Sequence, residues 1–134
     1  MNTPHRIVNP WTWQDQFGFV QAVVAGPASQ WVFLAGQGPS DADGNLVHEG
    51  DIGGQLNHAF DNIETVLAQA GANLSHVVRL NYYTTDVDAL LGVWNVVGER
   101  LAAAGCRPSS TLLGVQRLAF PEMLVELEAT ALVP

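Results

Sequence analysis

One amphipathic stripe dominates the middle of the chain and limits the folds that it can adopt. In the segment 51-DIGGQLNHAFDNIETVLAQAG-71 the apolar residues recur in steps of three and four, which is the spacing of one helix face. The stripe consists of Ile52, Leu56, Ala59, Phe60, Ile63, Val66, Leu67 and Ala70. Asp51 is suited to cap the first turn, and Gly71 is suited to end the last one. A helix of this kind must bury its apolar face against a second layer of structure.

Strand-like runs on both sides of this helix supply the second layer. We expect strands at 17–25, 31–35, 76–84, 109–117 and 123–132, and a second amphipathic helix over 86–104 that ends at Gly105. The order ββαβαββ contains two β-α-β crossovers and two hairpins, the first through 26-GPASQ-30. We therefore predict an α+β fold, in which a mixed sheet carries both helices on one face. The chain is long enough for a single domain over 1–134, with residues 1–16 as an N-terminal arm.

The other face of this sheet is left open by the two predicted helices. The strands are nearly continuous apolar runs, so apolar side chains should also point to the open face. A small domain with such a face usually closes it against copies of itself. We therefore expect the chain to self-associate.

Charge and composition exclude several classes of function. The formal net charge is −8, and the five basic residues are all arginines. Five scattered cations do not make a nucleic-acid surface, and the lack of lysine excludes a Schiff base or a Walker-type phosphate loop. No apolar run is long enough to cross a membrane, and no hydrophobic signal segment is recognisable at the N-terminus. With Cys106 as the single cysteine, we expect a cytoplasmic protein without an internal disulfide.

Neither a metal site nor a nucleotide fingerprint is recognisable. The four histidines lie in the arm, a loop, a helix and a strand start, and no two have metal-ligand spacing. Cys106 follows a helix end, where the dipole disfavours a thiolate, so we interpret it as structural. The glycines after the second strand do not form GxGxxG, although Gly36 suggests a close approach of a ligand or another chain.

Two further groups are candidates for chemistry. Glu126 and Glu128 are two apart in the last strand, so both should point to the open face, where Arg79 and Arg117 are possible partners. The aromatic group of Trp11, Trp13, Phe17 and Phe19 could either line a pocket or plug the space under the arm.

Five segments together resemble the RidA (YjgF) family of enamine/imine deaminases. They are 18-GFVQA-22, 33-FLAGQGP-39, 61-DNIETVLAQAGANLSHVVRLNYYTTD-86, 107-RPSSTLLGVQRL-118 and 124-LVELEATA-131. The resemblance implies a chorismate-mutase-like α+β fold and a homotrimer with three clefts between neighbouring subunits. It also implies hydrolysis of 2-aminoacrylate-like imines to a 2-keto acid and ammonia, with no metal or organic cofactor.

This sequence departs from the family pattern at its substrate clamp. In the family motif P-x-R-S an arginine binds the substrate carboxylate, and Ser110 stands at that position here, which places the chain in an arginine-less branch. Phe19 replaces a frequent tyrosine, and Glu126 matches the family glutamate if one residue is inserted near Ala119–Phe120. The resemblance assigns Glu126 as the catalytic residue. It implies that the substrate is bound by eight further residues: Phe19, Gly36, Gln37, Leu90, Ser109, Ser110, Thr111 and Leu112.

The resulting hypothesis is a deaminase that acts on a substrate other than 2-aminoacrylate. One hydroxyl cannot replace a planar, charged guanidinium. Arg107 and Arg117 are the two candidates to take over the role of the missing arginine. The alternatives are a non-catalytic trimer that binds a small molecule in the clefts, a ribonuclease or translation inhibitor, and a purely structural trimer. The acidic charge disfavours the ribonuclease.

Overall fold

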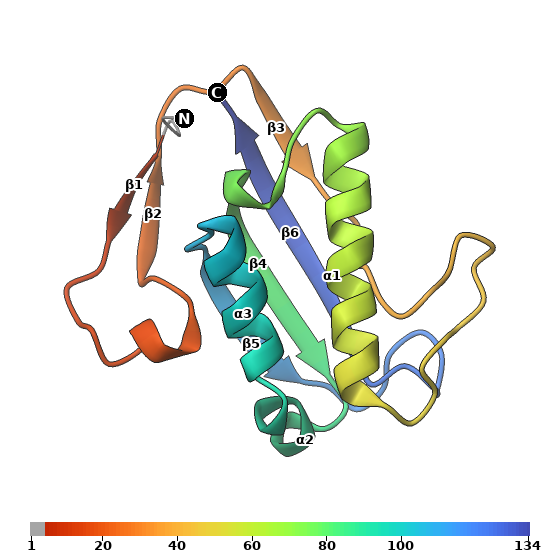
Figure 1. The fold of residues 1–134 in the computed structure, drawn as a ribbon. Helices are drawn as coiled ribbons and strands as arrows, with labels where there is room; N and C mark the ends of the chain where they lie inside the picture. Colours follow the sequence, from red (N-terminus) through yellow and green to blue (C-terminus); the bar gives the residue numbers. More distant parts are fainter. Residues whose placement is uncertain (1–4) are drawn as a thin grey trace.

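A four-stranded mixed sheet forms the centre of the molecule, and the helices lie on one of its faces (Figure 1). The computed structural model describes residues 5–134. The strands of this sheet, in spatial order, are β3 (Gln30–Phe33), β6 (Val125–Val133), β4 (Val77–Thr84) and β5 (Ser109–Gly114). β6 is antiparallel to both of its neighbours, and β4 and β5 are parallel. The predicted mixed sheet with helices on one face is therefore confirmed.

The long helix α1 (Ile52–Gln69) follows its sequence pattern closely. The carboxylate of Asp51 accepts a hydrogen bond from the backbone N–H of Gly54 at 3.0 Å, and Gly71 has the left-handed φ of 77° expected after a helix end. Leu56, Phe60 and Ile63 are fully buried in the core between α1 and the sheet. The predicted stripe thus covers the sheet, except at Val66, whose side chain is exposed.

The second predicted helix is in fact two helices, α2 (Val87–Gly92) and α3 (Asn95–Ala104). Asp86 caps α2 by accepting a hydrogen bond from the N–H of Ala89 at 3.0 Å. The break follows Gly92, a poor helix former. It turns the indole of Trp94 toward the N-terminal part of the chain, where its N–H donates to the carbonyl of Phe17 at 3.0 Å.

Both predicted hairpins are wrong. β2 (Ala22–Ala25) does not pair with β3 but with β1 (His5–Val8), in a separate antiparallel ribbon that includes part of the predicted arm (Figure 1). β4 lies between β5 and β6, so these two strands do not pair either. A strand's own sequence does not specify its partner, because pairing depends on which edges the rest of the fold leaves available. Residues 1–4 of the predicted arm lie outside the described residues.

The two faces of the sheet differ in chemistry. On β4, Leu80 and Tyr82 are buried under the helices, whereas Arg79, Asn81 and Tyr83 lie on the open face. The centre of the open face is thus more polar than expected. Apolar exposure lies at its edges, as at Trp31 and Phe33 on β3, whose rings stack with centroids 6.1 Å apart.

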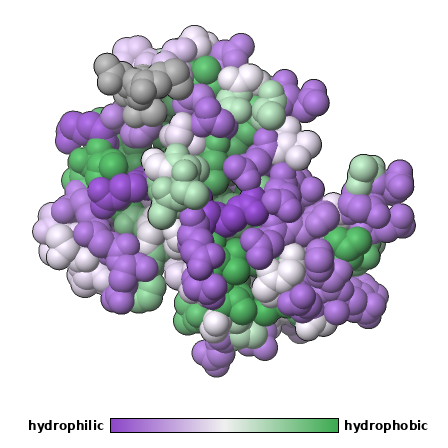
Figure 2. Space-filling model, viewed as in Figure 1, coloured by the Kyte–Doolittle hydropathy of each residue, from purple (hydrophilic) through white to green (hydrophobic). Residues whose placement is uncertain are grey.

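The helix-covered side, by contrast, is predominantly hydrophilic (Figure 2). None of the helices formed by residues 5–134 has both the length and the apolar character that a membrane span requires. Trp31 and Phe33 are thus exposed on the uncovered face of the sheet, whereas the other exposed aromatic side chains lie outside the sheet strands: Trp11, Trp13, Phe17 and Phe120.

Candidate active site

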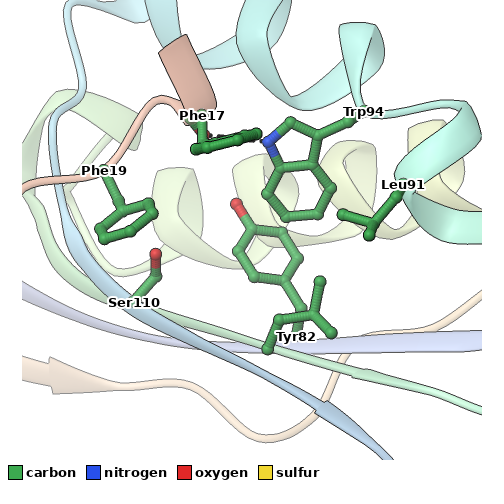
Figure 3. A pocket seen from close by; sticks show the side chains of 7 residues that line it. Phe17, Phe19, Tyr82, Leu91, Trp94 and Ser110 are labelled. Atoms are coloured by element: carbon green, nitrogen blue, oxygen red, sulfur yellow. Dashed lines mark hydrogen bonds between the residues drawn. The ribbon is translucent and has the colours of Figure 1, made fainter. Parts of the chain in front are cut away.

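A cavity of about 320 Å³ opens between the N-terminal segment, α2, the start of α3 and the edge of the sheet. Figure 3 shows how its side chains face one another. Its lining consists of Phe17, Phe19, Tyr82, Leu91, Trp94, Ser110 and Leu112. Four of these side chains are aromatic, and none among them is charged. The cavity can therefore enclose a flat apolar group, but it offers no ion pair from within this chain.

The hydroxyl run of β5 does not face one site. The hydroxyl of Ser109 donates to the carbonyl of Val78 at 2.9 Å, and the hydroxyl of Thr111 accepts a hydrogen bond from the guanidinium of Arg79 at 2.6 Å on the open face. Only Ser110 points into the cavity (Figure 3). Successive strand residues alternate between the faces, so a run of three small residues at a strand start must diverge.

The aromatic wall of the cavity comes from the segment before β2. Gln14 is fully buried there, and its side-chain amide donates to the carbonyl of Trp11 at 3.0 Å and accepts from the side chain of Gln21 at 3.0 Å. This network and a left-handed Gly18, with φ of 85°, bring Phe17 and Phe19 to the cavity. The pocket interpretation of the aromatic group thus holds for Phe17 and Phe19, which line the cavity. Trp11 and Trp13 are exposed, so they do not form the alternative plug under the arm.

One predicted lining residue is replaced by its neighbour. Leu90 is fully buried in the core and does not contact the cavity, whereas Leu91 lines it. One residue along a helix turns the side chain by about 100°, and the register of α2 places Leu91 on the cavity side. Tyr82 and Trp94 also line the cavity, and the sequence analysis missed both of them as site residues. The register of β4 against β5, which pairs Leu80 with Ser110 and Tyr82 with Leu112, brings Tyr82 there, and the break between α2 and α3 places Trp94 at the cavity.

The carboxylate pair lies on the other face of the sheet. Glu126 and Glu128 both point to the open face at β6, as their spacing predicts. The alternate residues Val125 and Leu127 are buried on the other face. Glu128 accepts hydrogen bonds from the hydroxyl of Tyr83 and from the side-chain amide of Asn81, the latter at 3.1 Å. These donors lower the pKa of Glu128 below its ordinary value.

Glu126 has the opposite electrostatic environment. Partial burial raises its pKa, and the negative charge of Glu128 raises it further. No side-chain donor among the described residues forms a hydrogen bond to Glu126. A carboxylate of this kind is a stronger base than an ordinary glutamate and is available to hold a water molecule.

Gly36 lies directly against this carboxylate. A Cβ atom at Gly36 would come within 3.0 Å of each carboxylate oxygen of Glu126. The next residue, Gln37, holds the chain in place, because its N–H and C=O both bond to the backbone of Leu127, at 2.6 and 2.9 Å. Two groups of predicted site residues result: Phe19, Ser110 and Leu112 at the cavity, and Gly36 and Glu126 on the open face across the sheet. The side chain of Gln37 belongs to neither group, because it lies on the helix side beside His58 and Asn62 of α1. A single chain does not bring the two groups together.

The comparisons with known proteins identify the family. The sequence model described as endoribonuclease L-PSP matches residues 14–133, nearly the whole chain. The chain belongs to the RidA/YjgF family. A RutC family protein of Pyrococcus abyssi is 32% identical over 112 residues, which cover 79% of this chain and 86% of that protein.

Solved structures of RidA/YjgF proteins agree with this assignment. The chain matches YyfB of Yersinia pestis, described as a protein of unknown function of the conserved Rid family, with a TM-score of 0.86 and 34% identity, over 98% of this chain and all (100%) of YyfB. Rv2704 of Mycobacterium tuberculosis, described as a member of the YjgF/YER057c/UK114 family, matches with a TM-score of 0.66 and 32% identity, over 96% and 99% of the two chains.

The arginines that could replace the RidA/YjgF clamp are engaged elsewhere. Arg107 forms an ion pair with Asp15 at 3.3 Å, and Arg117 donates to the carbonyls of Leu118 and Ala119, both at 3.3 Å. Neither lines the cavity around Ser110. Across residues 5–134, histidine, cysteine and acidic side chains nowhere gather in a group of three that could hold a metal ion. Cys106 is buried, which raises the pKa of its thiol to about 12.

Proposed function

We propose that this protein hydrolyses reactive imines or enamines to a carbonyl compound and ammonia. The observation that carries the proposal is Glu126, a carboxylate with a raised pKa that lies against the backbone of Gly36 on the open face of the sheet. Membership in the RidA/YjgF family supports it. The proposed reaction uses water as its only co-reactant, and its steps need only proton transfer by the protein.

In the proposed mechanism Glu126 positions a water molecule and takes up one of its protons as the oxygen attacks the carbon of the C=N bond. Glu126 passes this proton to the imine nitrogen as the C=N bond becomes a single bond, which gives a neutral carbinolamine. Glu126 then takes the proton of the carbinolamine hydroxyl as the carbonyl forms and the C–N bond breaks. It delivers that proton to the departing nitrogen, so ammonia leaves and the carboxylate is regenerated.

The complete site is proposed to lie between subunits of a homotrimer. The cavity with Ser110 and the face with Glu126 are on opposite sides of one sheet, so a neighbouring copy would have to supply the missing half of each site. Exposed Trp31 and Phe33 on the open face support self-association, because large aromatic side chains with 53% and 74% of their surface exposed are costly to leave in water. The proposed partner is thus a small molecule bound in clefts between copies, with no role for nucleic acid or a membrane.

The substrate is proposed to differ from 2-aminoacrylate. A carboxylate clamp in a desolvated site is worth about 2–5 kcal/mol, and the uncharged hydroxyl of Ser110 cannot supply it. The neighbouring Arg107 is paired with Asp15. Small 2-imino acids should therefore be poor substrates.

The test is an imine-hydrolysis assay with 2-aminoacrylate and bulkier imines generated in situ by a lyase or an amino-acid oxidase. Release of the carbonyl product is compared between the wild type, Glu126→Gln and Glu128→Gln. We expect activity on bulky imines that falls at least about 100-fold in Glu126→Gln, the usual contribution of a positioned general base. Glu128→Gln is the matched control on the same strand, since Glu128 is already bonded to Tyr83. Equal activity in Glu126→Gln and the wild type would contradict the mechanism.

A second candidate is a trimer that binds a small molecule without turnover. The observation that favours it is the uncharged cavity lining, in which Ser110 stands where the family motif has its arginine. In that case the wild type would be inactive on every imine in the assay, whereas Ser110→Arg would acquire activity on 2-aminoacrylate.

A further inference from the structure

Two hydroxyl groups point into the aromatic cavity without a hydrogen-bond partner. They belong to Tyr82, whose side chain is otherwise fully buried, and to Ser110 on the neighbouring strand (Figure 3). Neither hydroxyl bonds to the other or to any other group in the described part of the chain. The hydroxyl is the part of the Tyr82 side chain that the cavity leaves accessible, so a ligand in the cavity can accept its hydrogen bond.

Tyr82 can act there only as a neutral group. Burial raises the pKa of its phenol well above the ordinary value, so it keeps its proton and can donate a hydrogen bond. Ser110 offers a second donor beside it. Donors of this kind match an uncharged carbonyl, hydroxyl or imine-type acceptor on the ligand.

The rest of the lining restricts the ligand further. Phe17, Phe19 and Trp94 surround the two hydroxyls, and the rings of Tyr82 and Trp94 pack with centroids 4.8 Å apart. Aromatic walls of this kind favour a flat ring. An anionic group would lose its hydration in the cavity without gaining a cationic partner, which is unfavourable.

We propose that Tyr82 and Ser110 bind an uncharged oxygen or nitrogen acceptor on an aromatic, ring-sized side chain, and that imines carrying such a side chain are the substrate class. The assignment of the substrate class rests on the proposed function. It requires the imine carbon to lie at the mouth of the cavity, toward Glu126 of a neighbouring copy. Tyr82 is then a specificity-determining residue that binds the substrate away from the reacting bond.

The test uses three probes with one ring: 4-fluoroacetophenone, 4-fluoroethylbenzene and 4-fluorobenzoate. Their binding to the purified full-length protein is measured by ¹⁹F NMR titration. We expect the ketone to bind at least about 10-fold more tightly than the hydrocarbon, which lacks the acceptor, and than the benzoate, which carries a charge.

Tyr82→Phe should weaken binding of the ketone by about 5- to 30-fold and leave binding of the hydrocarbon unchanged, because it removes one hydrogen bond and keeps the ring. Ser110→Ala should also weaken binding of the ketone. Tyr83→Phe is the matched control, since it removes a tyrosine hydroxyl from the opposite face of the same strand and should leave ketone binding unchanged. Thermal unfolding of each variant establishes that it is folded.

Equal affinity for the ketone and the hydrocarbon in the wild type would overturn the proposal. So would an unchanged ketone affinity in folded Tyr82→Phe, or tightest binding of the benzoate. The imine assay is independent of this result. If the ketone binds through Tyr82 but no imine is hydrolysed, the proposed function fails and the binding site stands. If imines are hydrolysed but Tyr82→Phe binds the ketone normally, the proposed function stands and the proposed binding site fails.

Discussion

A Cβ atom at Gly36 would lie 2.7 Å from Cδ of Glu126, a separation that real Cβ contacts do not show. The backbone of one segment and the carboxylate of another are therefore in direct contact only because residue 36 has no side chain. The backbone bonds between Gln37 and Leu127 keep the two segments from moving apart. The position of the Glu126 carboxylate thus depends on Gly36.

Replacement of Gly36 by alanine should displace this carboxylate and reduce imine hydrolysis at least about 10-fold, because a general base must be within hydrogen-bond reach of its water. Gly98→Ala is the control, since a Cβ at Gly98 meets nothing within 4 Å and alanine is the better helix former in α3. Steady-state rates and thermal unfolding of both variants are the measurements. A Gly36→Ala variant with normal rates would show that the Gly36 contact does not position Glu126.

The two glutamates should affect stability in opposite directions as pH changes. The pKa of Glu126 is raised in the folded protein. Its favourable contribution to folding stability is therefore present below pH 4.5, the ordinary pKa of the group, and is lost as pH rises through the folded-state pKa. Glu126→Gln should therefore be more stable than the wild type at pH 7, and this advantage should disappear near pH 4.

For Glu128, whose pKa is lowered, the contribution is present above 4.5 and is lost as pH falls through the folded-state pKa. Glu128→Gln should be less stable than the wild type at pH 7. Both differences should stay below about 1 kcal/mol, because the two carboxylates are partly solvated. The free energy of unfolding from urea titrations between pH 3 and 8, at one protein concentration, measures them, and differences of the same sign for both variants would contradict the assignment.

The aromatic wall should depend on Gln14. Gln14→Ala leaves the polar groups of Asn9, Trp11 and Gln21 without their partner, at a cost of about 1–3 kcal/mol. The effect should be local, so the amide protons of Phe17 and Gly18, which bond to Gln14 and Asp15, should exchange faster with solvent. Gln16→Ala, at an exposed side chain, is the control and should have little effect. Unchanged hydrogen exchange in Gln14→Ala would mean that the segment is held by other contacts.

Cys106 should be unreactive in the folded protein. Its thiol has a pKa of about 12 and is 3.8 Å from the carbonyl of Val77, in the core. Because the thiolate is the reactive form, a disulfide reagent at pH 8 should label the native protein far more slowly than the chain in urea. Rapid labelling of the native protein would show that this part of the core opens readily.

The elements that repeat a local pattern were predictable from the sequence. The helix from Asp51 to Gly71 carries its own stripe and its own end signals, and Glu126 and Glu128 share a face because strand residues alternate. The partners of the strands were not predictable in this way. β2 pairs with β1 and not with β3, and such a choice depends on edges that distant segments leave free.

The candidate site shows the same division. The sequence by itself determined that a hydroxyl stands where the family motif has an arginine, and that two carboxylates lie on one face of the last strand. Only the tertiary structure decided that Ser109, Ser110 and Thr111 diverge, that Leu91 replaces Leu90, and that the hydroxyl of Tyr82 enters the cavity. The physical reason is that residue types and periods are local properties of the chain. Which side chains meet depends on strand register and helix rotation, which are determined by packing the whole core at once.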